Sequence, residues 1–354
     1  MTQVGMIEYL NVRIRYLHSQ LFSRDTYEDL LSGENLGILT TFLLNHPDYR
    51  EDIGQALEHL PERAGLERGV TNNFARRISC TLNLAGGKPR RLFEIALFSF
   101  DLRNIKTILL ARARGVTPKK AMDMLIPCCS VTGQKLNELL RSKNSGDFRY
   151  AIARCFPFGL NDIDDIFESA EKGTPVVSLL NRIEKDAYRG ILGILSESNH
   201  DMRILRNIFR CEIDMKNIAT ALKAVWRGEP PVNTTETAFI PGGFINDQFL
   251  NEMTKVHELD EAFEMVESTQ FHPAVEKGII YYAETGFLHE MERFFEEVFI
   301  KKILSFRRFD PFGIGVFIGY VWGKYIEMTN LRTIINGIAF GLGPAQIRKD
   351  LIYV

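Results

Sequence analysis

The sequence predicts an all-α protein built from three tandem, structurally similar helical domains. Three observations lead to this prediction: one seven-residue motif occurs three times at a constant spacing, its apolar residues recur at helical intervals, and strand signals are scarce. The chain has 354 residues, of which 45% are hydrophobic. That length and composition allow two or three domains with buried cores.

The repeated motif has an acid, an asparagine three residues later, an isoleucine or leucine next to it, and then a threonine. The asparagines of successive copies are 113 residues apart in both steps. Because the spacing is identical twice, the copies indicate a repeated unit. The motif residues are Asp101, Asn104 and Thr107; Asp214, Asn217 and Thr220; and Glu327, Asn330, Arg332 and Thr333.

Glycine and proline follow each copy at fixed distances. A glycine lies 11 residues after each asparagine and a proline 14 residues after it. Glycine favours the left-handed conformation that ends a helix, and proline prevents continuation. Each motif is therefore predicted to lie in a helix that ends at the same point, marked by Gly115, Gly228 and Gly341 and by Pro118, Pro231 and Pro344.

A second register supports the repeat, because Ile126-Pro127 and Ile240-Pro241 are 114 residues apart. A period of this size is longer than the roughly 20–50 residues of a solenoid unit, so each repeat is domain-sized. We place the repeats at residues 1–120, 121–232 and 233–354, with Gly-Glu-Pro-Pro at 228–231 as the clearest linker.

The acid and the asparagine lie one turn apart on one helix face. Asparagine is a poor helix former, so its presence in all three copies suggests a specific role. We interpret that role as structural: the asparagine satisfies backbone groups of a neighbouring helix, and the acid takes a basic side chain or a helix N-terminus. Contact with a partner protein is the alternative, although identical contacts in every repeat are rarely needed.

No motif for catalysis or for cofactor binding is found, and we predict no catalytic residue, no cofactor and no metal site. The chain has no G-x-x-x-x-G-K-[ST] string and no H-E-x-x-H string, and its five cysteines form no C-x-x-C pair. The formal net charge of −2 does not suggest nucleic-acid binding. The longest stretch without Lys, Arg, Asp or Glu, residues 333–347, is too short for a membrane span of about 20 residues.

Two alternative functions are kept. The first is a helical scaffold or interaction protein. The second is an all-α cyclase or lyase in which Asp162, Asp164 and Asp165 deliver a proton, because clustered carboxylates can raise one another's pKa. The same acidic string is also what a helix N-terminus prefers, and this is the interpretation that we favour.

The C-terminal motif is part of a longer resemblance. Residues 324–334, Lys-Tyr-Ile-Glu-Met-Thr-Asn-Leu-Arg-Thr-Ile, resemble the K-E-x-E-[IL]-x-N-L-R-x-I signature of the C subunit of V/A-type (vacuolar-type) ATPases, whose eukaryotic counterpart is the d subunit. Residues 347–351, 100–107 and 9–15 resemble the family's ending, first repeat and opening. Tyr325 departs from the signature's glutamate, and Ala219 replaces the basic residue that the other two repeats carry as Lys106 and Arg332.

The resemblance implies an arrangement and a role. Family members resemble a funnel of three helical domains with pseudo-threefold symmetry. They are non-catalytic rotor subunits that link the central-stalk shaft subunits to the membrane proteolipid ring for rotary ion transport and ATP synthesis. The resemblance thus implies a peripheral protein at the cytoplasmic face, associated with the membrane only through the ring.

Overall fold

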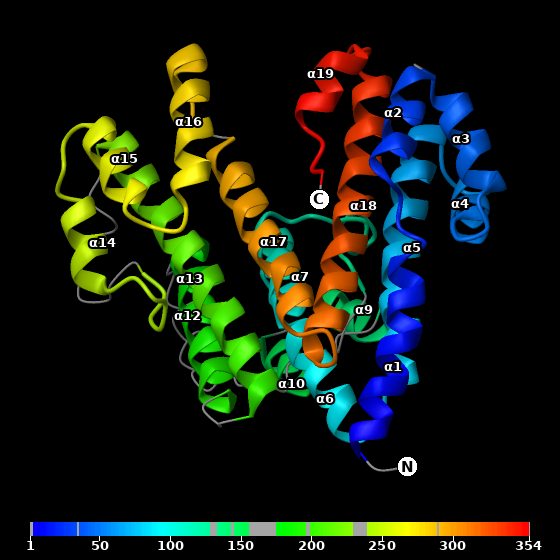
Figure 1. Ribbon diagram of the computed structural model, residues 1–354, viewed down its shortest axis with the longest axis horizontal. Helices are drawn as coiled ribbons and strands as arrows, with labels where there is room; N and C mark the ends of the chain where they lie inside the picture. The colour runs from blue at the N-terminus through cyan, green and yellow to red at the C-terminus, as the bar shows by residue number, and fades with distance from the viewer. Residues whose placement is uncertain are drawn as a thin grey trace. The chain divides into compact units, whose positions relative to one another are not determined.

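The computed structural model describes residues 3–33, 35–127, 133–142, 145–155, 175–195, 199–228, 239–288 and 290–353. Within these ranges every regular element is a helix, and no strand occurs (Figure 1). The predicted all-α class is confirmed.

The chain packs as two compact units, and the first is discontinuous in sequence: it combines residues 1–143 with residues 307–354. Its long helices are α5 and α18, and shorter helices surround them. The helices of this unit are α1 (Gln3–His18), α2 (Arg24–Ser32), α3 (Leu36–Asn45), α4 (Arg50–Leu57), α5 (Glu62–Leu84), α6 (Gly87–Ala96), α7 (Phe98–Ala113), α8 (Pro118–Met122), α9 (Gly133–Arg141), α18 (Ile314–Ala339) and α19 (Pro344–Lys349).

The second unit comprises residues 144–306. Its longest helix is α13, which begins at an N-cap asparagine, Asn199, whose side chain accepts a hydrogen bond from the Asp201 amide. The helices of this unit are α10 (Ser145–Cys155), α12 (Val176–Ile194), α13 (His200–Arg227), α14 (Asp247–Met253), α15 (Leu259–Glu267), α16 (His272–Thr285) and α17 (Met291–Phe309), whose last turn lies in the first unit.

The core of the first unit forms around α5, which packs against both α4 and α18. Leu66, Val70, Phe74 and Ile78 recur every four residues on one face of α5, and each is completely buried. This spacing is that of an amphipathic helix. Burial of each such side chain contributes about 1.5–3 kcal/mol to stability, so this stripe fixes α5 against its neighbours.

The three motifs lie in α7, α13 and α18, as the sequence predicts, and each helix ends at the predicted glycine. Gly115, Gly228 and Gly341 have positive φ angles of +64°, +64° and +72°. In the first and third copies the residue after the glycine donates its amide to a carbonyl five residues back, Val116 to Ala111 and Leu342 to Gly337, both at 2.9 Å. This is the Schellman bond, so the predicted C-caps are confirmed.

The two units are defined by which residues pack together, whereas the predicted repeat boundaries come from the 113-residue period of the sequence. The third motif helix, α18, packs against α1, α3, α5 and α6, which all belong to the first 120 residues. Residues 233–306 lie in the other unit. The division into three repeats with pseudo-threefold symmetry stays a prediction, and the linker residues 229–231 lie outside the described residues.

Candidate functional site

The three motif asparagines make the same pair of hydrogen bonds. In each copy the amide nitrogen donates to the carbonyl oxygen of one isoleucine, and the amide oxygen accepts that isoleucine's backbone N–H. The distances are 2.7 and 2.9 Å for Asn104 with Ile126, 2.9 and 2.8 Å for Asn217 with Ile240, and 2.9 and 2.9 Å for Asn330 with Ile352. All three side chains are buried. We call these three pairs the asparagine clips.

The backbone groups that the asparagines bind belong to single residues in non-helical segments. The prediction that these groups belong to a neighbouring helix is wrong. Ile126 and Ile240 each precede a proline, which biases the preceding residue towards an extended conformation. The Ile-Pro pairs of the second sequence register therefore mark the clip partners. The third partner, Ile352, precedes Tyr353 and carries no such mark.

The motif acids are buried in all three copies but have different surroundings. Asp214 accepts the backbone N–H of Ile245 at 3.0 Å, and Gly243 lies so close to its carboxylate that a Cβ there would clash. Burial raises the pKa of Asp214 to about 6, although backbone hydrogen bonds and Arg210 act in the opposite direction. Asp101 is fully buried on α7.

The remaining motif residues are less buried. Thr107 and Thr220 each donate a hydroxyl hydrogen bond to the carbonyl four residues back, at 2.9 and 2.8 Å. Thr333 is half-buried, and Arg332 is exposed. The structure thus brings each acid and asparagine into the interior of its unit and leaves the basic position at the surface in the third copy.

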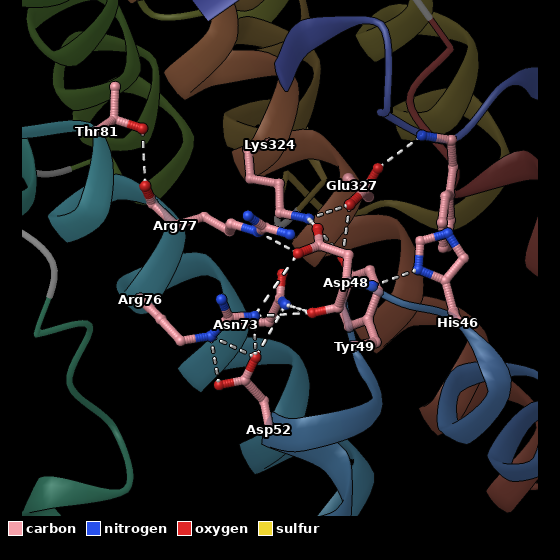
Figure 2. Close-up of polar contacts among 11 residues, drawn as sticks. His46, Asp48, Tyr49, Asp52, Asn73, Arg76, Arg77, Thr81, Lys324 and Glu327 are labelled. Atoms are coloured by element: carbon pink, nitrogen blue, oxygen red, sulfur yellow. Dashed lines mark hydrogen bonds and ion pairs between the residues drawn. The ribbon is translucent and has the colours of Figure 1, made fainter. Parts of the chain in front are cut away.

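Glu327, the third motif acid, belongs to a buried ion-pair network with Lys324, one turn earlier on α18 (Figure 2). The Lys324 ammonium lies 2.5 Å from a Glu327 oxygen and 2.9 Å from an Asp48 oxygen, and it donates to the Tyr49 hydroxyl at 3.2 Å. Glu327 also accepts the Tyr49 hydroxyl at 2.5 Å and the Phe22 backbone N–H at 2.6 Å. Lys324 and Glu327 are almost completely buried.

The network continues from Asp48 to α5. Arg77 forms an ion pair with Asp48, and Arg76 binds Asp52 through two nitrogens, at 2.7 and 3.0 Å (Figure 2). Burial alone would raise the pKa of Asp48, but Lys324 and Arg77 outweigh it and hold that pKa below its usual value. Burial, and then the charge of Glu327, raise the pKa of Tyr49 well above 10, so its hydroxyl stays a donor.

The buried pair explains part of the C-terminal signature in physical terms. Its lysine and glutamate connect α18 to the segment between α3 and α4 and to Phe22, two residues before α2. These contacts span 276–305 residues of sequence. The repeated motif identified Glu327 and the resemblance identified Lys324, but neither identified Asp48 or Tyr49, because no local pattern links segments so far apart.

A cavity of about 260 Å³ lies beside the network. Asp48, Arg77 and Lys324 form part of its wall, together with His46, Tyr16 and Gln20. The charged groups among them are paired with one another or with Glu327. The wall therefore offers a ligand no unmatched charge, and we assign it none.

The described residues contain no cluster of three or more His, Cys, Asp or Glu side chains placed to hold a metal ion. Asp162, Asp164 and Asp165, the acids of the cyclase alternative, lie outside the described residues. Across the part of the chain that the structure describes, no helix is both long and apolar enough to span a membrane.

Comparison with known proteins agrees with the motifs. Residues 10–350 match the family described as ATP synthase (C/AC39) subunit. The chain belongs to this family. It is therefore a subunit of an ATP synthase of the V/A type, a structural component of a larger complex and not an enzyme by itself.

Archaeal relatives match over nearly the whole length of both chains. The chain is 21% identical to the A-type ATP synthase C subunit of Methanocaldococcus jannaschii, over 97% of this chain and 86% of the relative. It is 25% identical to that of Methanococcoides burtonii, over 97% and 93%. The protein of the same name from Thermoplasma acidophilum is 23% identical, over 96% of each chain.

Proposed function

We propose that the protein is the rotor subunit that links the central stalk of a V/A-type ATPase to the membrane proteolipid ring. In this role it lies at the cytoplasmic face as a peripheral protein and transmits rotation between ATP turnover and ion transport. The observation that carries the proposal is the family match over residues 10–350, together with the three-copy motif.

A joint of this kind has to grip a single shaft and a ring of many identical subunits. Three similar lobes around an axis could receive the shaft inside and rest on the ring below. The task requires stiffness and fit, and no chemistry. The asparagine clips and the buried Lys324–Glu327 network supply stiffness, because each fixes a buried backbone or charged group with several hydrogen bonds.

Two interfaces follow from this role. The tip of the coiled-coil shaft would enter an axial cavity, and the cytoplasmic loops of the ring would contact a flat face. A joint that bears torque and also releases on disassembly should have polar and charged contacts at its rim. Exposed ion pairs are screened over about 8–10 Å at physiological salt, so shaft binding should be sensitive to salt.

Reconstitution tests the proposal. The full chain is mixed with the shaft subunits and, separately, with the detergent-solubilised ring, and binding is measured from low to high salt. We expect complexes with both partners at low salt and weaker shaft binding as salt rises. If the protein binds neither partner at low salt, the rotor role is wrong.

A further inference from the structure

The outer face of α1 and the turn between α17 and α18 together expose an unusual set of apolar side chains. Phe309 and Phe312 in the turn are 80% and 72% exposed, and Val12 and Tyr16 on α1 are 69% and 66% exposed. Tyr9, one turn before Val12, is also exposed. These five residues, with Arg13, Arg15, Arg307 and Arg308, are called the α1 patch, and all lie in the first unit.

The turn is fixed against α1, so these side chains belong to one surface. The Asn11 amide donates to the Phe312 carbonyl at 2.6 Å, and Arg15 donates to the Pro311 carbonyl. Asn11 and Arg15 lie one turn apart on α1. Tyr9, Val12 and Tyr16 occupy the adjacent sector of the helix, roughly 100° further round, given 3.6 residues per turn.

The charged side chains among the residues of the α1 patch are four arginines. All four of its arginines are exposed. Residues 9–20 contain no acid, and the single acid of residues 307–313, Asp310, is buried and accepts the Gly315 amide at 2.8 Å. Burial, and then Arg307, lower the pKa of His18 to about 4, so His18 adds no charge at neutral pH.

We propose that the α1 patch binds the surface of an anionic phospholipid bilayer. Tyrosine and arginine suit the headgroup region, because each combines an apolar body with a polar end. Phe309 and Phe312 flank Pro311 in a turn between two helices, and a bilayer accommodates such apolar side chains without a matching pocket. A protein partner would need complementary shape to bury them. The arginines match the negative charge of the lipid surface.

This inference goes beyond the proposed rotor role, in which contact with the membrane passes through the ring. It adds a direct contact between the chain and lipid. The two can be tested separately, because protein-free vesicles report only on lipid binding and reconstitution with the shaft and ring reports only on the rotor role.

Co-sedimentation of the full chain with vesicles tests the proposal. The vesicles contain phosphatidylcholine alone or phosphatidylcholine with about 30% phosphatidylserine, whose anionic headgroups give the surface a negative potential. We compare the wild type with Phe309→Ser/Phe312→Ser and with Arg13→Gln/Arg308→Gln. The matched control is Ile38→Ser/Arg50→Gln, which changes exposed residues outside the patch. Circular dichroism checks that each variant is folded.

We expect binding to the anionic vesicles, weaker binding to phosphatidylcholine alone, and loss at high salt. The phenylalanine variant should bind at least about tenfold more weakly, because burial of the two rings contributes at least that factor to binding. Each arginine near an anionic surface contributes about fivefold, so the arginine variant should lose roughly 25-fold. The control should bind as the wild type does.

A second measurement reports insertion directly. In Phe312→Trp, emission should be quenched by brominated lipids beyond the quenching of wild-type Trp226 and Trp322. The proposal is overturned if the wild type binds neither vesicle, or if both patch variants bind like the control. It is also overturned if light scattering shows a dimer that Phe309→Ser/Phe312→Ser abolishes, because the patch would then bind a second copy.

Discussion

The asparagine clip of α13 can be tested by replacing Asn217 with leucine. Leucine has the same branched arrangement of four side-chain heavy atoms as asparagine, so the substitution removes the two hydrogen bonds to Ile240 without opening a large cavity. Each bond contributes a net of about 0.5–1.5 kcal/mol, which gives about 1–3 kcal/mol for the pair. The upper part of this range is expected, because the N–H and C=O of Ile240 lose their partner.

The assay is urea denaturation followed by circular dichroism, with amide hydrogen exchange measured in the peptide that contains Ile240. Asn207→Leu is the matched control, because Asn207 lies on the same helix and is exposed. It should leave stability unchanged or raise it by a few tenths of a kcal/mol through helix propensity. If Asn217→Leu is as stable as the control and the Ile240 amide exchanges at the wild-type rate, the clip has no stabilising role.

Three further predictions concern titration, the buried pair and nucleotide. Because the pKa of Asp214 is raised to about 6 from 3.8, the native state binds its proton more tightly than the unfolded state. The unfolding free energy of the wild type relative to that of Asp214→Asn should therefore fall as the pH rises from about 4 to 6, by at most about 1.4 kcal/mol per pH unit. A difference between the two proteins that does not change with pH would contradict this. Lys324→Met should destabilise the protein by about 3–5 kcal/mol, because it leaves Glu327 buried without its cation. Lys324→Met/Glu327→Gln should recover much of that loss in urea denaturation, and an equal loss in both variants would refute the pair's role. Isothermal calorimetry of the isolated protein should show no micromolar binding of ATP, because the chain has no P-loop.

The helix class and the helix ends could be predicted because they depend on local chemistry. Gly115, Gly228 and Gly341 adopt the left-handed conformation that glycine favours, and Pro118 and Pro344 begin the next helices. The asparagines were identified by their spacing, but their partners lie 22 or 23 residues downstream. The partners could not be found from helix periodicity, because each is a single residue in a non-helical segment.

The buried network was beyond sequence reasoning for a different reason. Whether Glu327 pairs with a residue near 48 or near 210 depends on which helices pack together, and that choice is made by apolar surfaces such as the buried face of α5. The departure at Tyr325 shows the same limit. In the structure Tyr325 packs edge-on against Phe74 and Phe100, and its hydroxyl accepts a hydrogen bond from Arg103 at 3.0 Å.

The discontinuity of the first unit has a consequence for biosynthesis. Residues 1–143 emerge from the ribosome before α18, against which α1 and α5 pack. At 5–20 residues per second, roughly 10–40 s pass before the last 48 residues complete the unit. Residues 144–306 emerge as one uninterrupted segment and can fold first. The part of α5 that packs against α18 therefore lacks its partner during translation. A chain shortened before Lys324 should leave the ribosome with an incomplete first unit and depend on chaperones to stay soluble.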